Sequence, residues 1–384
     1  MAAWSRRPNY GSDMPEKGHT ILSRCPFLVS VIVFCLLLLG VEGVSFVAMK
    51  GGFWAHGPAM VDANLAKTYP GQPLDEVKTV LHESRAGIEY RYRPFVEFDV
   101  RPRTGRFVNV QHEGYRSAVA LSWPPPPDAI FLFGGSTAFG FGVRDAETIN
   151  YYLSELLHRP VYNFAVPAYY STPERVRFFT FVTEGVVPKT AVFIDGMNDF
   201  IFFDVPDKSK ASKRLEFALD TNYRYIFLRL LSQLNTVKFV ASLTNQPEDF
   251  LLRERRATLE QIRKAAQRLI RNREIVNAFC EAQAVECLFV TQPVPTVNYD
   301  AGRKPVQLSG DYFGAENCVE GYQILAEHYG ASPNRNYLDL SGVEGPEPTY
   351  VDNLHYSAGM NKVIAERIAD AVKRLSRSSP SGSH

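Results

Sequence analysis

The chain has 384 residues, of which 45% are hydrophobic and 22% are charged. That length and apolar fraction suffice for one large domain or two ordinary ones with a buried core, and they exclude a chain that is disordered throughout. The 42 Lys and Arg residues nearly balance the 41 Asp and Glu residues, which leaves a formal charge of +1 and no long run of one sign, so no nucleic-acid partner is expected.

An apolar segment near the N-terminus differs from the rest of the sequence. Residues 27–48 contain a dense apolar run, Phe27 to Gly40, and weaker apolarity after it, which together suffice for a membrane span of about 20 residues. The leader before it, residues 1–26, carries four basic residues: Arg6, Arg7, Lys17 and Arg24. By the positive-inside bias these keep the N-terminus in the cytoplasm. We therefore expect a single-pass anchor with the rest of the chain in the periplasm or at the cell surface; a signal peptide cleaved near Gly43 is the alternative.

Five cysteines are distributed over both parts of the chain. Cys25 and Cys35 belong to the leader or the span, which leaves Cys280, Cys287 and Cys318 for the exported part. An odd number of thiols cannot all pair within one chain. A Cys287–Cys318 bond is one option in an oxidising compartment, but nothing in the spacing requires it, so we expect three buried unpaired thiols.

Residues 49–125 lack strong helical periodicity and are expected to form a small β-rich collar. Aromatic and charged residues alternate from Ile88 to Val100, as in a strand with two different faces. One face would hold Tyr90, Tyr92 and Phe98, and the other Arg91 and Arg93. The tetraproline at 124–127 ends this part, because consecutive prolines fix an extended backbone and supply no donors to a sheet.

From residue 126 to 376 short apolar runs alternate with helical stretches. Four runs are rich in β-branched or aromatic residues, as buried parallel strands are: 129–135, 160–166, 190–195 and 286–292. Helices are expected over 148–157, 173–184, about 259–269 and 359–375. This alternation predicts a three-layer α/β/α sandwich with a mainly parallel sheet. Residues 377–384, which are rich in serine, are expected to be a disordered tail.

Residues from about 200 to 256 interrupt that alternation and mix aromatic with charged residues. This insertion is expected either to cover the site as a cap or lid, or to be a helical excursion that only packs on the domain. Basic residues continue from it into the next helix: Arg253, Arg255, Arg256, Arg263, Lys264, Arg268, Arg271 and Arg273. Glu254, Glu260 and Glu274 lie among them, which favours an ordinary solvated helix face over a surface for lipid or an anionic glycan.

A serine follows the first apolar run, in the sequence Gly134-Gly135-Ser136-Thr137. A serine at the carboxyl end of a parallel strand lies where open α/β sheets bind ligands. A phosphate-binding turn of the Gly-Lys-Ser type is disfavoured because the lysine is missing, and Ala138 excludes the Gly-x-Ser-x-Gly elbow. Taken alone, the motif is weak.

Three further segments lie at comparable positions. Asn163 to Ala168 follows the second run, Asp195-Gly-Met-Asn198-Asp199 follows the third, and Asp352-Asn-Leu-His355 precedes the last helix. In order and position, these segments and the serine motif resemble the sequence blocks of the SGNH, or GDSL-like, hydrolase superfamily, over residues 129 to about 375. The collar, with Gly114-Tyr-Arg-Ser117, resembles the exported, membrane-anchored branch of that superfamily.

The resemblance implies a role for each matched residue. Ser136 would be the nucleophile, His355 its general base and Asp352 the carboxylate that orients the base, an arrangement that activates a serine hydroxyl by removing its proton. The backbone N–H groups of Ser136 and Ala168 and the side-chain amide of Asn198 would form the oxyanion hole. Two positions depart from the family pattern. The serine block reads Gly-Gly-Ser-Thr where the family has Gly-Asp-Ser-Leu, and Ala168 replaces a glycine, which strains the turn if it requires a positive φ.

Other chemistries are less well supported by the sequence. Glu155 and His158 are a rival acid and histidine pair, but they belong to an amphipathic helix on which a surface i,i+3 pair is the ordinary explanation. The eight histidines are scattered, and neither His-x-x-x-His nor Cys-x-x-Cys occurs, so no metal and no cofactor are expected.

The expected function is that of a serine esterase or O-acyl transfer enzyme, which acts through an acyl-serine on an envelope or exported polysaccharide that bears acetyl groups. A lipid ester is the alternative substrate, and a non-catalytic glycan-binding or assembly protein is the alternative class. The catalytic residues do not separate hydrolysis from transfer. The sequence leaves the acyl group, the acceptor and the oligomeric state open.

Overall fold

The computed structural model describes residues 26–203, 227, 230–231, 233–243, 256–299, 314–331 and 334–378. The leader up to residue 25, residues 379–384 of the expected tail, and most of the insertion expected at 200–256 lie outside the described residues. Arg253 and Arg255 of the basic cluster also lie outside them. The expectations of a lid and of a disordered tail therefore stay predictions.

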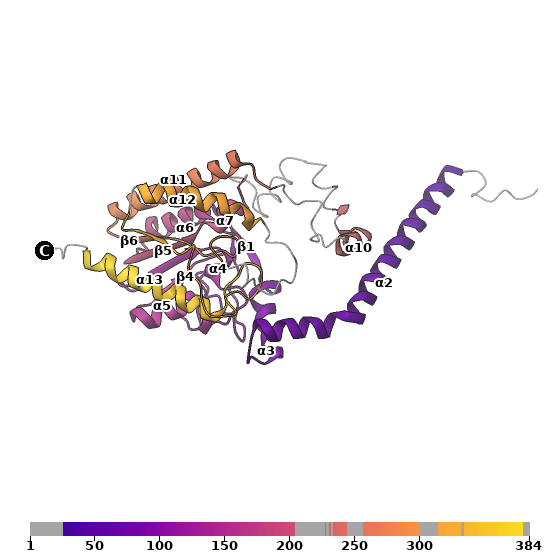
Figure 1. The fold of residues 1–384 in the computed structure, drawn as a ribbon, viewed down its shortest axis with the longest axis horizontal. Coiled ribbons are helices and arrows are strands. Elements are labelled where there is room, and N and C mark those ends of the chain that lie inside the picture. The colour runs from indigo at the N-terminus through magenta and orange to yellow at the C-terminus, as the bar shows by residue number, and fades with distance from the viewer. Residues whose placement is uncertain are drawn as a thin grey trace, which may run out of the picture.

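A single long helix, α2 (Pro26–Thr68), begins the described part of the chain and extends away from the α/β body (Figure 1). Its stretch Val29–Ala48 is long and apolar enough to cross a membrane, with a mean hydropathy of 2.5, and only 6% of it is buried within the protein. This stretch coincides with the anchor expected at 27–48. A signal sequence near the N-terminus can have the same length and composition.

The helix continues past the apolar stretch into the segment for which the sequence predicted a β-rich collar. Leu65 and Tyr69 are buried there in an apolar cluster with Val77, Val143 and Val351. Two short helical elements follow, α3 (Leu74–Leu81) and the π-helical turn η1 (His82–Ala86). The first half of the collar is thus helical and not β-rich as predicted. The sequence did not reveal this helix, because α3 has only 8 residues and its apolar spacing repeats too few times to be recognised.

The second half of the collar contains the expected strand alternation. β1 (Tyr90–Arg93) and β2 (Glu97–Val100) form a two-stranded antiparallel sheet. On one face Tyr90 packs edge-on against Phe98, with ring centroids 5.5 Å apart. On the other face Arg91 and Arg93 both bind the buried Asp99. The predicted difference between the two faces is therefore confirmed.

Five parallel strands form the central sheet in the order β4-β3-β5-β6-β7. They are β3 (Ile130–Gly134), β4 (Val161–Asn163), β5 (Thr190–Asp195), β6 (Glu286–Thr291) and β7 (Tyr337–Asp339). The first four lie within the four predicted apolar runs. The fifth escapes prediction because its three residues form no apolar run.

Helices cover both faces of this sheet, which gives the predicted three layers (Figure 1). The described helices of this part are α4 (Ser136–Phe139), α5 (Ile149–Leu157), α6 (Ser171–Thr183), α7 (Met197–Ile201), α11 (Leu259–Ala282), α12 (Cys318–Ala331) and α13 (Ala358–Ser378). The helix α10 (Asn235–Leu243) packs against α2 instead. Alternate residues of β3 enter two different cores. Ile130 and Leu132 pack with residues of α5 and α13, whereas Phe131 and Phe133 pack with residues of α6 and α11.

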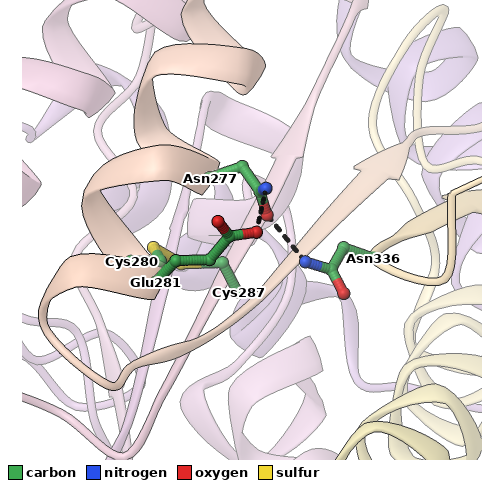
Figure 2. Close-up of a disulfide and its surroundings, with 5 residues drawn as sticks. All are labelled: Asn277, Cys280, Glu281, Cys287 and Asn336. Carbon is green, nitrogen blue, oxygen red and sulfur yellow. Dashed lines mark hydrogen bonds between the residues drawn. A yellow bond between two sulfur atoms is a disulfide. The ribbon is translucent and has the colours of Figure 1, made fainter.

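One disulfide, Cys280–Cys287, joins the end of α11 to β6 (Figure 2). Their Cα atoms are 6.2 Å apart, and Cys318 is a free buried thiol. The expectation of three unpaired thiols is therefore wrong, and so is the alternative Cys287–Cys318 bond. The sequence could not reveal this pair, because the two cysteines meet only where the chain folds back from α11 onto the sheet. Beside them Asn277 donates to Glu281 and accepts from Asn336, at 2.8 and 2.7 Å, which ties α11 to the segment before β7.

Candidate active site

Ser136 lies at the carboxyl end of β3, near the middle of the sheet, and is the first residue of α4. The turn that leads to it has no room for side chains. A Cβ atom on Gly135 would lie 2.3 Å from Nδ2 of Asn198, and one on Gly134 would lie 2.5 Å from the Cβ of Ala138. A side chain at position 135 would therefore require the Asn198 amide to move.

Ser136, His355 and Asp352 form a continuous hydrogen-bonded series. The Oγ of Ser136 is 2.8 Å from Nε2 of His355. The Nδ1 of His355 is 2.9 and 2.8 Å from the two carboxylate oxygens of Asp352. A carboxylate only accepts hydrogen bonds, so Nδ1 carries the proton and Nε2 is left to accept from the serine hydroxyl. The three residues are 7 to 9% exposed, so the series is largely shielded from water.

The loop between β7 and α13 holds the acid and the histidine in register. Oδ1 of Asp352 accepts the backbone N–H groups of Leu354 and His355, each at 2.8 Å. Such a turn is built from residues that are neighbours in sequence. The Asp-x-x-His spacing is therefore sufficient to bring this carboxylate and this imidazole together, as predicted from the sequence.

Asp352 has a further partner that the sequence did not indicate. The Nη2 of Arg85, in η1, lies 3.0 Å from Oδ2 of Asp352. Burial raises the pKa of Asp352, but His355, Arg85 and the N–H of Leu354 together outweigh burial and hold that pKa well below its usual range. The carboxylate is therefore ionised at every pH at which the protein is expected to work. No local motif surrounds Arg85 in the sequence, so only the fold could reveal this contact.

Asn198 and Ala168 flank the serine from the adjacent strands. Asn198 lies in α7, directly after β5, and its Nδ2 donates to the carbonyl of Tyr169 at 2.6 Å. An amide has two N–H bonds, so one remains available. Ala168 is exposed, and among the described hydrogen bonds its backbone N–H donates to none. The structure thus brings all five predicted residues to one edge of the sheet.

Ala168 has a φ of +71°, so the turn does require the left-handed conformation that glycine adopts easily. For a residue with a side chain this conformation costs about 1 to 2 kcal/mol. The positive φ also limits which substitutions can test the backbone N–H of Ala168. Proline cannot reach a positive φ, so Ala168→Pro would distort the turn as well as delete the N–H, and it would not isolate the role of the donor.

A buried polar network holds the Ala168 turn against α7. Asp199, the neighbour of Asn198, accepts the backbone N–H and the hydroxyl of Ser171, at 3.3 and 2.5 Å. Asn272 of α11 donates to the same hydroxyl at 2.8 Å. Because Ser171 follows the turn and Asp199 lies in α7 next to Asn198, these bonds fix the two predicted oxyanion-hole segments relative to each other.

The basic residues of α11 fall into two groups. Lys264 and Arg271 form exposed pairs with Glu260 and Glu274, as expected for a solvated face. Arg268 and Arg273 do not fit that expectation. Arg273 is buried and pairs with Asp195 at the end of β5, and Arg268 donates to the carbonyls of Asp199 and Phe202, at 3.1 and 3.3 Å. These two arginines face the domain because α11 packs against one face of the sheet, which its charge pattern did not reveal.

The rival pair is not at the site. Glu155 and His158 are both exposed, and His158 ends α5 with a φ of +51°. Neither residue contacts Ser136 through a described hydrogen bond, whereas His355 does.

No protein-family model matches the sequence, and no curated protein sequence matches it. The chain is similar in fold to solved structures of low identity. A lipolytic protein of the G-D-S-L family from Desulfitobacterium hafniense is 12% identical with a TM-score of 0.34, over 64% of this chain and 99% of that one. The lipase/acylhydrolase from Enterococcus faecalis is 14% identical with a TM-score of 0.34, over 66% and 99%. A family two carbohydrate esterase from Clostridium thermocellum, in complex with cellohexaose, is 12% identical with a TM-score of 0.32, over 68% and 67%.

These three neighbours are a lipolytic protein, a lipase/acylhydrolase and a carbohydrate esterase, and the likeness to them is one of fold.

Proposed function

We propose that this chain is a membrane-anchored serine esterase or O-acyl transfer enzyme that acts outside the cytoplasm. The observation that carries the proposal is the series from Ser136 Oγ to His355 Nε2 at 2.8 Å and from His355 Nδ1 to Asp352 at 2.8 Å. A binding module has no need for a serine hydroxyl bonded to an imidazole that is itself bonded to a carboxylate, whereas acyl transfer needs all three.

Each group then has a step in acyl transfer. Ser136 Oγ attacks the ester carbonyl carbon while its proton passes to Nε2 of His355. Asp352 stays ionised and stabilises the imidazolium that forms. The carbonyl oxygen becomes negative, and the N–H groups of Ser136 and Ala168 and the free N–H of Asn198 donate to it. His355 returns the proton to the departing alcohol, and an acyl-serine remains. A water or a sugar hydroxyl, deprotonated by His355, resolves it by the reverse sequence.

The substrate we propose is an acetyl ester on an envelope or exported polysaccharide. One exposed aromatic side chain supports a sugar ligand, because flat apolar rings pack well against sugar rings. Tyr92 is 73% exposed on the β1–β2 sheet. Phe98 of the same sheet packs against Tyr169, with ring centroids 5.3 Å apart, and Tyr169 adjoins Ala168. A lipid ester is the alternative substrate.

Labelling with a fluorophosphonate probe tests the proposal, because the probe reacts only with an activated serine. We expect the intact protein to be labelled and Ser136→Ala to remain unlabelled. Thr137→Ala provides a control, since that neighbouring hydroxyl should not matter for labelling. An unlabelled wild-type protein would favour the non-catalytic glycan-binding class. Mass spectrometry of envelope glycans with and without the gene would then identify the acyl group and the direction of transfer.

The proposed location rests on two features of the chain. The apolar stretch Val29–Ala48 follows a basic leader, which by charge bias exports the remainder. The Cys280–Cys287 disulfide fits the same location, because disulfides persist in oxidising compartments.

Protease added to spheroplasts should therefore digest the large domain of the full chain. A cytoplasmic marker protein in the same cells serves as the control and should survive. Protection of the domain would contradict the proposed topology, and a mature soluble form that lacks α2 would contradict the anchor.

The role of the Ala168 N–H leads to a further prediction. Replacement of the Ala168 amide by an ester, through incorporation of lactic acid, deletes this donor and leaves the turn otherwise unchanged. We expect kcat to fall about 100-fold with little change in KM, as for the loss of one oxyanion donor. Ala168→Gly is the matched control and should retain activity. Its free energy of unfolding should change by less than about 1 kcal/mol, because relief of the left-handed strain is offset by the greater freedom of glycine in the unfolded chain.

A further inference from the structure

Three consecutive residues of η1 make polar contacts beside the proposed triad, Ser84 and Arg85 with the catalytic domain and Glu83 with the collar. Ser84 is fully buried, and its Oγ accepts the N–H of Gly142 at 3.0 Å. Arg85 binds Asp352 at 3.0 Å. The carboxylate of Glu83 accepts three backbone N–H groups at 2.8 to 3.0 Å, those of Arg106, Phe107 and Val108. π-Helical turns often occur at functional sites, and in this one hydrogen bonds hold the two residues that precede Arg85.

Residues between α2 and the domain also bind the loop that follows α4. Gly142 has its N–H bound by Ser84 and its carbonyl bound by the hydroxyl of Tyr69 at 2.8 Å. Its φ is +78°, and a Cβ atom there would lie 2.7 Å from a methyl carbon of Val351. Val351 directly precedes Asp352. The loop after the serine helix and the loop of the acid therefore lie against each other, and residues between the membrane helix and the domain hold both.

Arg85 completes the coordination of the Asp352 carboxylate. Two backbone N–H groups hold Oδ1, as described above, and the guanidinium of Arg85 holds Oδ2. A carboxylate fixed at both oxygens cannot rotate away from the imidazole. Phe141 reinforces this arrangement, because its ring lies 4.9 Å from the ring of His355 and 6.0 Å from the guanidinium of Arg85. The Arg85 side chain is still 38% exposed, so it lies at the surface of the site.

We propose that Arg85 is a positioning residue for the Asp352–His355 pair, so that the segment between the membrane helix and the domain forms part of the catalytic site. The inference rests on the proposed esterase function. Arg85 acts through Asp352 and does not touch the reacting atoms. Its removal should therefore lower kcat and leave KM for a small ester unchanged.

Variants of the full-length chain test this role against an acetyl ester of small size. We expect Arg85→Gln to lower kcat about 10- to 100-fold, as is typical when a residue that orients a ligating or catalytic group is lost. Arg85→Lys, which keeps the charge, should retain more activity than Arg85→Gln. The matched control is Arg106→Ala, which removes an exposed arginine that pairs with Glu76 at 2.6 Å and should leave kcat within about 2-fold.

Chemical rescue separates positioning from folding. Guanidinium, added to Arg85→Ala far below denaturing concentrations, should restore a part of kcat, because the side chain that it replaces is partly exposed. The same addition should not raise the activity of Arg106→Ala. If neither lysine nor guanidinium restores turnover and the melting temperature falls, Arg85 is only structural and the proposal is overturned.

A spectroscopic readout tests the inference even without turnover. The proton that His355 Nδ1 donates to Asp352 gives a low-field NMR signal, which can be assigned by its loss in His355→Ala. In Arg85→Gln this signal should shift or broaden, and in Arg106→Ala it should not. An unchanged signal and an unchanged kcat in Arg85→Gln would overturn the inference. If the wild-type protein neither hydrolyses esters nor reacts with fluorophosphonate, the proposed function fails, while the NMR comparison still decides the role of Arg85.

Discussion

Ser136→Ala and His355→Ala should each lower the turnover of an acetyl ester by about 10⁴- to 10⁶-fold. The two groups act as one unit, because the hydroxyl is a useful nucleophile only while Nε2 of His355, at 2.8 Å, accepts its proton. The double variant should therefore be little slower than either single one. Steady-state kinetics on purified full-length protein, with thermal unfolding of each variant, would measure this.

His158→Ala is the matched control for the histidine. That residue is exposed at the end of α5, so its loss should leave kcat and the melting temperature nearly unchanged. If His158→Ala abolished turnover while His355→Ala left it intact, the assignment of the triad would be wrong. Equal and partial losses in all variants would instead indicate that turnover does not pass through Ser136.

The parts of the fold that could be predicted are those that depend on residues close together in the sequence. Four of the five strands lie within continuous apolar runs between helices, so their positions follow from period and composition alone. β7 and α3 escape the same reasoning. The strand lies in no apolar run, and the helix has only eight residues, too few for its period to repeat. The first half of the collar was misjudged for this reason, although the alternation of the β1–β2 sheet was recognised.

In the candidate site, too, residues that depend on their sequence neighbours could be predicted, whereas contacts between distant segments could not. Asp352 and His355 share one short turn, and Ser136 and Asn198 each follow a strand, so their positions could be predicted from neighbouring residues. Arg85 could not, because it reaches Asp352 from η1, an element far away in the chain. The Cys280–Cys287 bond and the burial of Arg273 escaped prediction for a related reason, since both depend on how α11 folds back across the sheet.

Asp352→Asn should lower kcat about 10⁴-fold while the fold stays intact. Asparagine has one oxygen and one NH2 group where aspartate has two acceptors. Its oxygen is expected to keep the bonds from the N–H groups of Leu354 and His355, both of which now reach Oδ1 at 2.8 Å. The NH2 group then occupies the position of Oδ2 and donates to Nδ1 of His355. The imidazole proton is forced onto Nε2, so the base can no longer accept from Ser136.

The same variant tests whether Arg85 acts through the carboxylate. In Asp352→Asn the guanidinium of Arg85 meets an NH2 group in place of the oxygen that it binds at 3.0 Å, so its positioning role is already lost. Arg85→Gln should therefore cost about 10- to 100-fold in the wild-type background but little in the Asp352→Asn background. A double-mutant cycle on kcat measures the difference. If the two losses multiplied, Arg85 would influence turnover independently of Asp352, and the proposed path from η1 through the carboxylate to the base would be wrong.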